Sequence, residues 1–311
     1  MVSSDALTFG FLLGAFLCGC GAFVGLAANA GAVGNIRRGN VRTGFWGAVE
    51  SSVDWCEENY DHHGLVAELH NTWTSGLIAT AGLLTLHNAW RVGAERRYYL
   101  ASATLAMVGV GSTLFHMTLQ RGMQALDEVP MVWLATLGAY CLYADKFPSA
   151  SQSRDASSVE ARPPAWLPVV LAAMLGALTC LMVLTHSTVA VVAFHLSFAP
   201  VEVFYFVMAI RLAVACPHAP TRALLRRCFV LYGVAILAWV ADIVFCETVQ
   251  SRLPFNPQLH AYGWHVCVSL ATHGLITAML RERTAALHPG RRVTLHTRWL
   301  LPSVSVGPLA K

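Results

Sequence analysis

Hard oxygen ligands are concentrated in one short stretch of the chain, Asp54-Trp55-Cys56-Glu57-Glu58-Asn59-Tyr60. A further carboxylate, Glu68, follows just inside a long apolar run. Calcium prefers carboxylate and amide oxygens, and backbone carbonyls from the same turn can complete its roughly six to eight positions. Asp54, Glu57 and Asn59 therefore predict a calcium site, with a solvated acidic turn as the alternative interpretation.

Imidazole, hydroxyl and carboxyl side chains recur at the ends of other apolar runs. Ser112 and His116 are four residues apart and share one helix face, and Asp127 follows after a short loop. His260 and His265 open the last apolar run. Converging groups of this kind form catalytic zinc sites, in which three protein ligands leave one position open for water.

Other histidines fit a simpler interpretation. A lone histidine in an apolar helix more often makes a hydrogen bond between helices than a bond to a metal ion. We place three side chains in that class: His70, His195 and His273.

The composition predicts an all-α polytopic membrane protein. Apolar residues make up 56% of the chain and charged residues 12%, and the mean hydropathy is +0.53. About 20 apolar residues cross a bilayer as a helix, whereas a membrane β-barrel shows short alternating strands. Seven such runs predict a seven-transmembrane-helix bundle within residues 45–280: Leu65 to Trp90, Tyr98 to Leu119, Leu126 to Tyr143, Trp166 to Leu184, Val189 to Val214, Leu225 to Cys246, and Ala261 to Leu280.

Basic residues are unevenly distributed between the connections of these runs. Most lie after the first, third, fifth and seventh runs, whereas the opposite loops hold only Arg121 and Arg252. Because positive connections remain cytosolic, we expect a lumenal acidic stretch and a cytosolic C-terminus. The expected location is the endoplasmic reticulum or Golgi membrane, with the lipid bilayer and no nucleic acid as partner; protein partners are left open.

Three segments lie outside the predicted helices. Residues 1–44 contain an uncharged apolar run that is either a signal sequence or an additional membrane helix. The Ser- and Pro-rich stretch from Lys146 to Pro164 predicts a mobile cytosolic loop. Residues 281–311 predict a basic cytosolic tail.

Two of the nine cysteines differ from the others in position. Cys56 precedes the first run and Cys246 ends the sixth. The parity of the runs places both on the non-cytosolic side, where thiols can be oxidised. A disulfide between them is therefore a hypothesis.

Several blocks together resemble one family in the same order along the chain. They cover residues from about Phe45 to the end of the seventh run: Asp54 to Tyr60, Ala67-Glu68, Asn71-Thr72, Glu95 to Tyr98, Gly111-Ser112, Phe115 to Leu119, Leu126 to Glu128, Pro130-Met131, Trp239, Asp242, Phe245 to Glu247, His260-Ala261 and Trp264-His265. The chain resembles the alkaline ceramidases, which belong to a superfamily of seven-helix membrane hydrolases that includes the adiponectin receptors.

This resemblance implies an activity and a set of ligands. The expected reaction is zinc-dependent hydrolysis of the ceramide amide to a sphingoid base and a fatty acid. The implied zinc ligands are His116, His260 and His265, while Ser112 and Asp127 line the reaction centre. The implied calcium ligands are Asp54, the Trp55 carbonyl, Glu57, Asn59 and Glu68. A disulfide between Cys56 and Cys246 also has a family counterpart.

In the implied mechanism, zinc lowers the pKa of a water molecule that attacks the amide carbonyl. Asp127 passes a proton to the leaving amine, and Ser112 helps to hold the oxyanion. The alternative is a receptor-like or lipid-binding seven-helix protein without ceramidase turnover. A transporter is a further rival, but its polar residues would line a path through both leaflets, whereas here they share one predicted depth.

The two histidines of the last run depart from the family spacing, which is His-x-x-x-His. Here four residues separate His260 from His265. Five steps of a regular helix leave two side chains about 140° apart, so these rings could not share one metal ion. We hypothesise a π-bulge at Gly263 that restores the alignment. Alternatively, His260 lies in a non-helical segment after Pro257.

Overall fold

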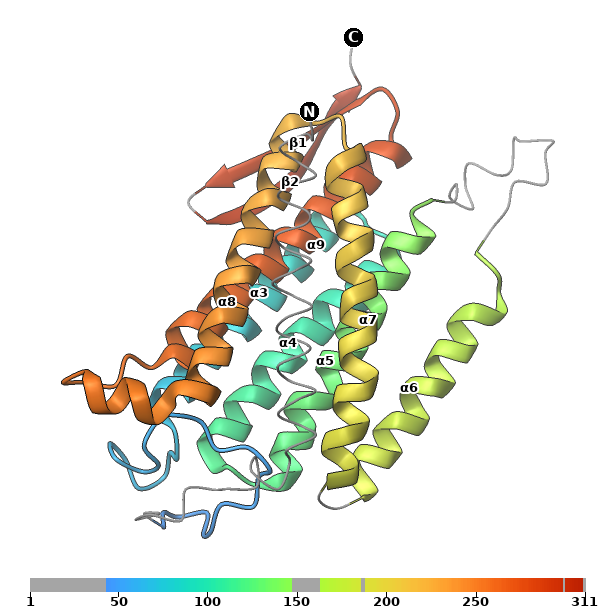
Figure 1. The fold of residues 1–311 in the computed structure, drawn as a ribbon. Coiled ribbons are helices and arrows are strands. Elements are labelled where there is room, and N and C mark those ends of the chain that lie inside the picture. Colours follow the sequence, from blue (N-terminus) through green and yellow to red (C-terminus); the bar gives the residue numbers. More distant parts are fainter. Residues whose placement is uncertain (1–42, 147–162, 186–187, 299, 310–311) are drawn as a thin grey trace, which may run out of the picture.

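A computed structural model describes residues 43–146, 163–185, 188–298 and 300–309 of the 311-residue chain (Figure 1). The predicted N-terminal helix or signal sequence lies outside the described residues, as does most of the predicted loop from Lys146 to Pro164. The described elements are α3 (Leu69–Val92), α4 (Arg96–Thr118), α5 (Arg121–Ala144), α6 (Trp166–Leu184), α7 (Thr188–Ala215), α8 (Ala219–Arg252), the π-helix η2 (Leu259–His265), α9 (Val266–Leu287), β1 (Arg291–Arg298) and β2 (Leu301–Leu309).

The fold is mainly helical and suits an integral membrane protein. Within the described ranges, five segments are long and apolar enough to cross a membrane: α4, α6, α7, α8 and η2 with α9. The first and third predicted runs also form helices, α3 and α5, of 24 residues each. Both carry polar side chains that face the candidate site, among them Asn71 and Thr74 of α3 and Asp127 of α5.

Small residues allow the central helices to approach closely. A Cβ atom at Gly82 of α3 would lie 2.2 Å from the backbone of Ala106, and one at Gly109 of α4 would lie 2.0 Å from the backbone of Ala79. Such contacts drive helix packing where lipid surrounds the bundle. By contrast, α6 lies at the edge of the bundle and buries only Met182 (Figure 1).

A β-hairpin caps one end of the bundle. Strands β1 and β2 pair antiparallel, and Val293 and Val304 point into the core. The carbonyl of Pro302 accepts hydrogen bonds from Asn88 of α3 and His273 of α9. The hairpin lies in the segment predicted as a basic tail, where strands of eight and nine residues form no long apolar run that would predict them.

A charge cluster holds the helices together near the same end. Arg283 of α9 donates hydrogen bonds to both carboxylate oxygens of Glu95, at 2.8 and 2.9 Å. Asp145 accepts from Arg97 and from the Tyr98 hydroxyl. Burial alone would raise the pKa of Glu95, but the hydrogen bond from Arg283 and the charge of Arg97 outweigh it and lower the pKa below its usual value.

The acidic loop, residues 43–68, closes the opposite end of the bundle (Figure 1). Backbone N–H groups of Ala67 and Glu68 donate to the carbonyls of Met117 and His116 at the end of α4. The structure contains the predicted disulfide, which joins Cys56 of this loop to Cys246 of α8 with a Cα–Cα distance of 5.5 Å. The loop is therefore tied to helices that are distant from it in sequence.

Candidate metal centre

Three buried histidines converge where the acidic loop meets the bundle. His116 comes from the end of α4, and His260 and His265 come from η2. Each offers one ligand nitrogen, and the three atoms lie within 4.8 Å of one another. The ring centroids are 4.5 to 5.2 Å apart. Among the His, Cys, Asp and Glu side chains of the described residues, these three form a group that is close enough to hold a metal ion.

The π-helix explains how His260 and His265 reach the same point. Residues Leu259–His265 form π-type turns, in which hydrogen bonds run from i to i+5. Side chains five residues apart then lie on one face. His260 and His265, which a regular helix would point in different directions, can therefore bind the same ion. The predicted π-bulge is confirmed, and it spans the whole segment rather than Gly263 alone.

Gly263 is required by the packing of this π-helix. A Cβ atom at this position would lie 2.3 Å from the Cβ of Ala238 on α8. No real side-chain contact is that short, so the two elements meet only because residue 263 has no side chain. The extra residue in the last run therefore fits a specific contact between η2 and α8.

Helix α3 and the residue before it orient all three imidazoles through Nδ1. His116 Nδ1 contacts the Glu68 carboxylate, His260 Nδ1 lies 3.0 Å from Asn71 Oδ1, and His265 Nδ1 lies 2.9 Å from Thr74 Oγ1. The first two partners accept hydrogen bonds. The Thr74 hydroxyl already donates to the His70 carbonyl, so it also accepts from the ring.

The three partners therefore select one tautomer. With the proton on Nδ1, each neutral ring has its lone pair on Nε2. Metal-binding histidines are commonly held in this way, by a carboxylate or another polar group on the nitrogen that does not bind the ion. The arrangement leaves three Nε2 atoms as the available ligands, which suits zinc.

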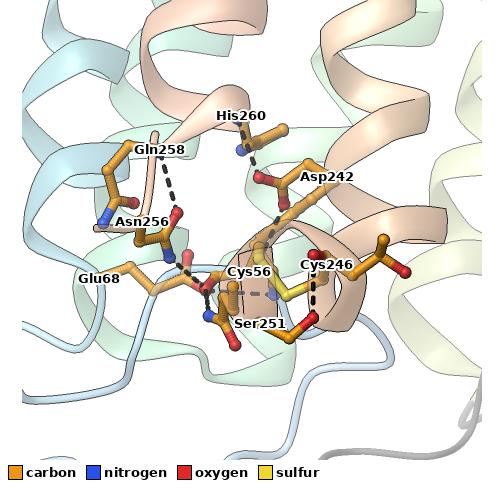
Figure 2. The surroundings of a disulfide bond; sticks show 11 residues. Cys56, Glu68, Asp242, Cys246, Ser251, Asn256, Gln258 and His260 are labelled. Carbon is orange, nitrogen blue, oxygen red and sulfur yellow. Dashed lines mark hydrogen bonds between the residues drawn. A yellow bond between two sulfur atoms is a disulfide. The ribbon is translucent and has the colours of Figure 1, made fainter. Parts of the chain in front are cut away.

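Asp242 connects the acidic loop to the π-helix. Its two carboxylate oxygens accept hydrogen bonds from the backbone N–H of Cys56 at 2.9 Å and of His260 at 3.2 Å (Figure 2). The disulfide of Cys56 with Cys246 lies beside these bonds (Figure 2). Asn256 also donates to the Cys56 carbonyl, at 2.7 Å. These contacts fix the loop relative to His260.

Ser112 and Asp127 lie one helical turn further into the bundle than His116. The Asp127 carboxyl is hydrogen-bonded to the Ser112 hydroxyl. Ser75 of α3 lies 2.9 Å from Ser112, between the hydroxyl oxygens. Gly111 allows this contact, because a Cβ atom there would lie 2.0 Å from the Leu126 carbonyl oxygen of α5. A carboxyl and a hydroxyl are thus brought together beside the histidine cluster.

The acidic loop also gathers the candidate calcium ligands. Asn59 donates to Asp54 at 3.0 Å, and the backbone of Trp55 donates to Glu68 at 3.3 Å. Glu57 accepts hydrogen bonds from the first N–H groups of α3, at His70 and Asn71.

Two features of this loop bear on whether it could hold a cation. The carbonyl oxygen of the Asn59 side chain is buried and has no hydrogen-bond partner among the described residues. Burial raises the pKa of Glu68 well above its usual value, and the nearby Asp54, Glu57 and Asp242 raise it further. A divalent cation would relieve both the repulsion and the unpaired oxygen.

Several residues of the site were missed or misjudged from sequence. Asn71, Thr74 and Ser75 received no role, although their spacing of three and four residues places them on one polar face of α3. Asp242 entered the sequence analysis only through the family resemblance, and in the structure it bridges the backbones of Cys56 and His260. His70 bonds to the Tyr262 hydroxyl at 2.8 Å, in line with its predicted role between helices.

Comparison with known proteins agrees with this geometry. A family model described as Ceramidase matches residues 47–305, which include the acidic loop, the histidines and part of the hairpin. Alkaline ceramidase 3 of Mus musculus is 29% identical over 253 residues, or 79% of this chain and 89% of the relative. Alkaline ceramidase of Arabidopsis thaliana is 30% identical over 238 residues, or 74% and 82%.

A third relative, alkaline ceramidase 1 of Homo sapiens, is 28% identical over 263 residues, or 83% of this chain and 92% of the relative. These matches extend over most of both chains, and the family match covers more than half of this one. The chain belongs to the ceramidase family.

Proposed function

We propose that this protein hydrolyses the amide bond of ceramide-type lipids to a sphingoid base and a free fatty acid, with zinc at the histidine cluster. The observation that carries the proposal is the convergence of His116, His260 and His265 with one tautomer selected for each ring. Family membership supplies the substrate class, because the relatives are alkaline ceramidases.

A zinc ion at these three nitrogens would act as a Lewis acid toward water and the amide carbonyl. Asp127, beside Ser112, would accept a proton from the attacking water and return it to the leaving amine. The Ser112 hydroxyl would donate a hydrogen bond to the oxygen on which negative charge develops. Ser75, bonded to Ser112, would hold that hydroxyl in position.

We further propose that calcium binds the acidic loop through Asp54, the Trp55 carbonyl, Glu57, Asn59 and Glu68. The proposal is supported by the buried, unpartnered Asn59 oxygen and by the clustered carboxylates. Glu68 would connect the two ions, because it also bonds to His116. Calcium would then stabilise the loop and indirectly the ligand His116.

The same proposal includes seven membrane spans, with the acidic loop lumenal in the endoplasmic reticulum or Golgi and the C-terminus cytosolic. α3 and α5 would join the five more apolar spans, since 24 residues extend about 36 Å at about 1.5 Å per residue. Asn71, Thr74 and Asn88 of α3 and Gln124 of α5 are buried inside the bundle, where they avoid lipid.

The test is release of fatty acid from ceramide by purified protein, with metal content measured by mass spectrometry. We expect the wild type to contain about one zinc per chain and to release fatty acid, and His116→Ala to lose both. Well-folded wild-type protein that carries zinc but leaves ceramide intact would contradict the hydrolase. Turnover that survives zinc removal would contradict the role of the histidine cluster.

A further inference from the structure

The indole of Trp55 carries a hydrogen-bond donor that is not used within the described chain. Its Nε1 atom is buried and has no hydrogen-bond partner among the described residues. An unpaired buried donor destabilises the folded state, and native proteins rarely keep one. A ligand that offers an acceptor oxygen would account for it.

This donor lies directly beside the candidate metal centre. The indole stacks on His260 with ring centroids 3.5 Å apart and planes inclined by 12°. The same indole lies 6.3 Å from the His116 ring. A group bound to Nε1 would therefore be next to any substrate whose amide lies at the three histidines.

The position of the indole is fixed by several contacts. The backbone N–H of Trp55 donates to Glu68, and the next residue, Cys56, is bound by the disulfide and by Asp242. Asp242 also holds the backbone of His260, on which the indole stacks. A donor held this firmly loses little conformational freedom when it binds a ligand.

The geometry indicates which oxygen of the substrate meets this donor. Ser112 and Asp127 lie deeper along α4 and α5, on the side proposed to contact the amide. Trp55 belongs to the loop that closes the end of the bundle, where the head group of a membrane lipid would lie (Figure 1). In a ceramide, the group beyond the amide on the head-group side is the primary hydroxyl at C1.

We propose that the Trp55 indole N–H donates a hydrogen bond to the C1 hydroxyl oxygen of the substrate, which makes Trp55 a specificity-determining residue. This inference rests on the proposed ceramide hydrolysis. A site with a buried donor discriminates against analogues that lack the acceptor, because the donor is then left unpaired. The enzyme should therefore prefer ceramide to 1-deoxyceramide, which carries a methyl group in place of the hydroxymethyl group.

The experiment compares wild type, Trp55→Phe and Trp73→Phe on ceramide and 1-deoxyceramide. Phenylalanine keeps an aromatic ring to stack on His260 but removes the N–H. Trp73 is a matched control because its side chain is exposed on α3. We expect wild type to favour ceramide about tenfold in kcat/KM, a preference that Trp55→Phe loses and Trp73→Phe retains.

Binding without turnover provides a second readout. Radiolabelled ceramide and 1-deoxyceramide would be titrated in detergent micelles onto protein from which a zinc-selective chelator has removed zinc in the presence of calcium. The same preference, and its loss in Trp55→Phe, are expected. Equal use of the two lipids by active wild-type enzyme would overturn the inference without affecting the proposed function. Discrimination that persists in zinc-replete Trp55→Phe would also overturn it. If wild type cleaves neither lipid and binds neither, the proposed function fails as well.

Discussion

His265 and His273 are two buried histidines eight positions apart on the same helical segment. Their Nδ1 atoms have similar partners, but their Nε2 atoms do not. Each Nδ1 lies beside a threonine hydroxyl of α3, Thr74 at 2.9 Å and Thr85 at 2.8 Å. The Nε2 of His273 is 3.0 Å from the Pro302 carbonyl, to which it must donate. One ring nitrogen of His265 instead lies within 4.8 Å of nitrogens of His116 and His260, and Nε2 is the nitrogen that Thr74 leaves free.

The difference separates a structural histidine from a candidate ligand. The carbonyl at Pro302 requires a proton on Nε2 of His273, so this nitrogen cannot bind a metal ion. At His265, a proton on Nδ1 satisfies Thr74, whose hydroxyl donates to the His70 carbonyl, and this tautomer leaves Nε2 with a lone pair. Burial is equal at the two sites, so the hydrogen-bond partners decide the chemistry.

The largest expected effect comes from replacing each histidine by alanine. His265→Ala should lose bound zinc and at least about 1,000-fold in ceramide hydrolysis, since the ion supplies the Lewis acid. His273→Ala should keep zinc and turnover but lose about 2 kcal/mol of stability, because it removes a buried side chain and one of the two hydrogen bonds to the Pro302 carbonyl. Metal analysis would measure the zinc content of each variant, and thermal unfolding in detergent would measure its stability. Zinc loss in His273→Ala, or zinc retention in His265→Ala, would contradict the distinction.

Thr74→Val should have a smaller effect at the same centre. Valine has nearly the shape of threonine but no hydroxyl, so the His265 ring loses the partner that fixes its tautomer. Removing such a partner typically weakens metal binding by about 10- to 100-fold. The equivalent change near His273, Thr85→Val, should leave zinc affinity unchanged. Competition with a chromophoric chelator would measure both, and equal affinities for the two variants would refute the role of Thr74.

Gly263→Ala tests whether the π-helix positions the ligands. The added methyl group would clash with Ala238, so η2 must shift away from α8 and carry His260 and His265 with it. We expect about a tenfold loss of zinc affinity. The double variant Gly263→Ala with Ala238→Gly should recover most of it, because the second change removes the obstructing atom. Wild-type affinity in the single variant would show that the close contact is unnecessary.

The charge cluster near the hairpin should give the smallest effect, and one that depends on pH. Because the pKa of Glu95 is lowered in the folded state, its ionised form contributes stability above the unfolded value near 4.5. This contribution is lost as pH falls through the folded pKa. Glu95→Gln should therefore unfold at a lower temperature than wild type at pH 7, and the difference should shrink below about pH 4.5. A difference that grows toward acid pH would contradict this assignment.

Local patterns in the sequence anticipated much of the helical fold. Long apolar runs predicted helices where the structure has α3 to α9, and the extra residue between His260 and His265 predicted the π-helix. The hairpin was not predicted because its strands are short. Its buried residues pack against the helices, and this packing leaves no long periodic pattern in the sequence.

The contacts within the candidate site could not be predicted from local sequence patterns. The histidines and acidic residues were identified from residue type, spacing and family resemblance. The hydrogen bond from the Cys56 backbone to Asp242 joins the acidic loop to α8 across 186 positions, and the stacking of Trp55 on His260 joins the same loop to η2. No local period encodes these contacts. They arise from the three-dimensional packing of the acidic loop against α8 and η2.

X-ray absorption spectroscopy at the zinc edge would test the central claim most directly, in zinc-replete wild type and the two alanine variants. We expect three nitrogen ligands at about 2.0–2.1 Å in wild type and in His273→Ala. We expect this signal to be lost in His265→Ala. Sulfur scattering at about 2.3 Å, or an identical spectrum from His265→Ala, would show that the ion is bound elsewhere.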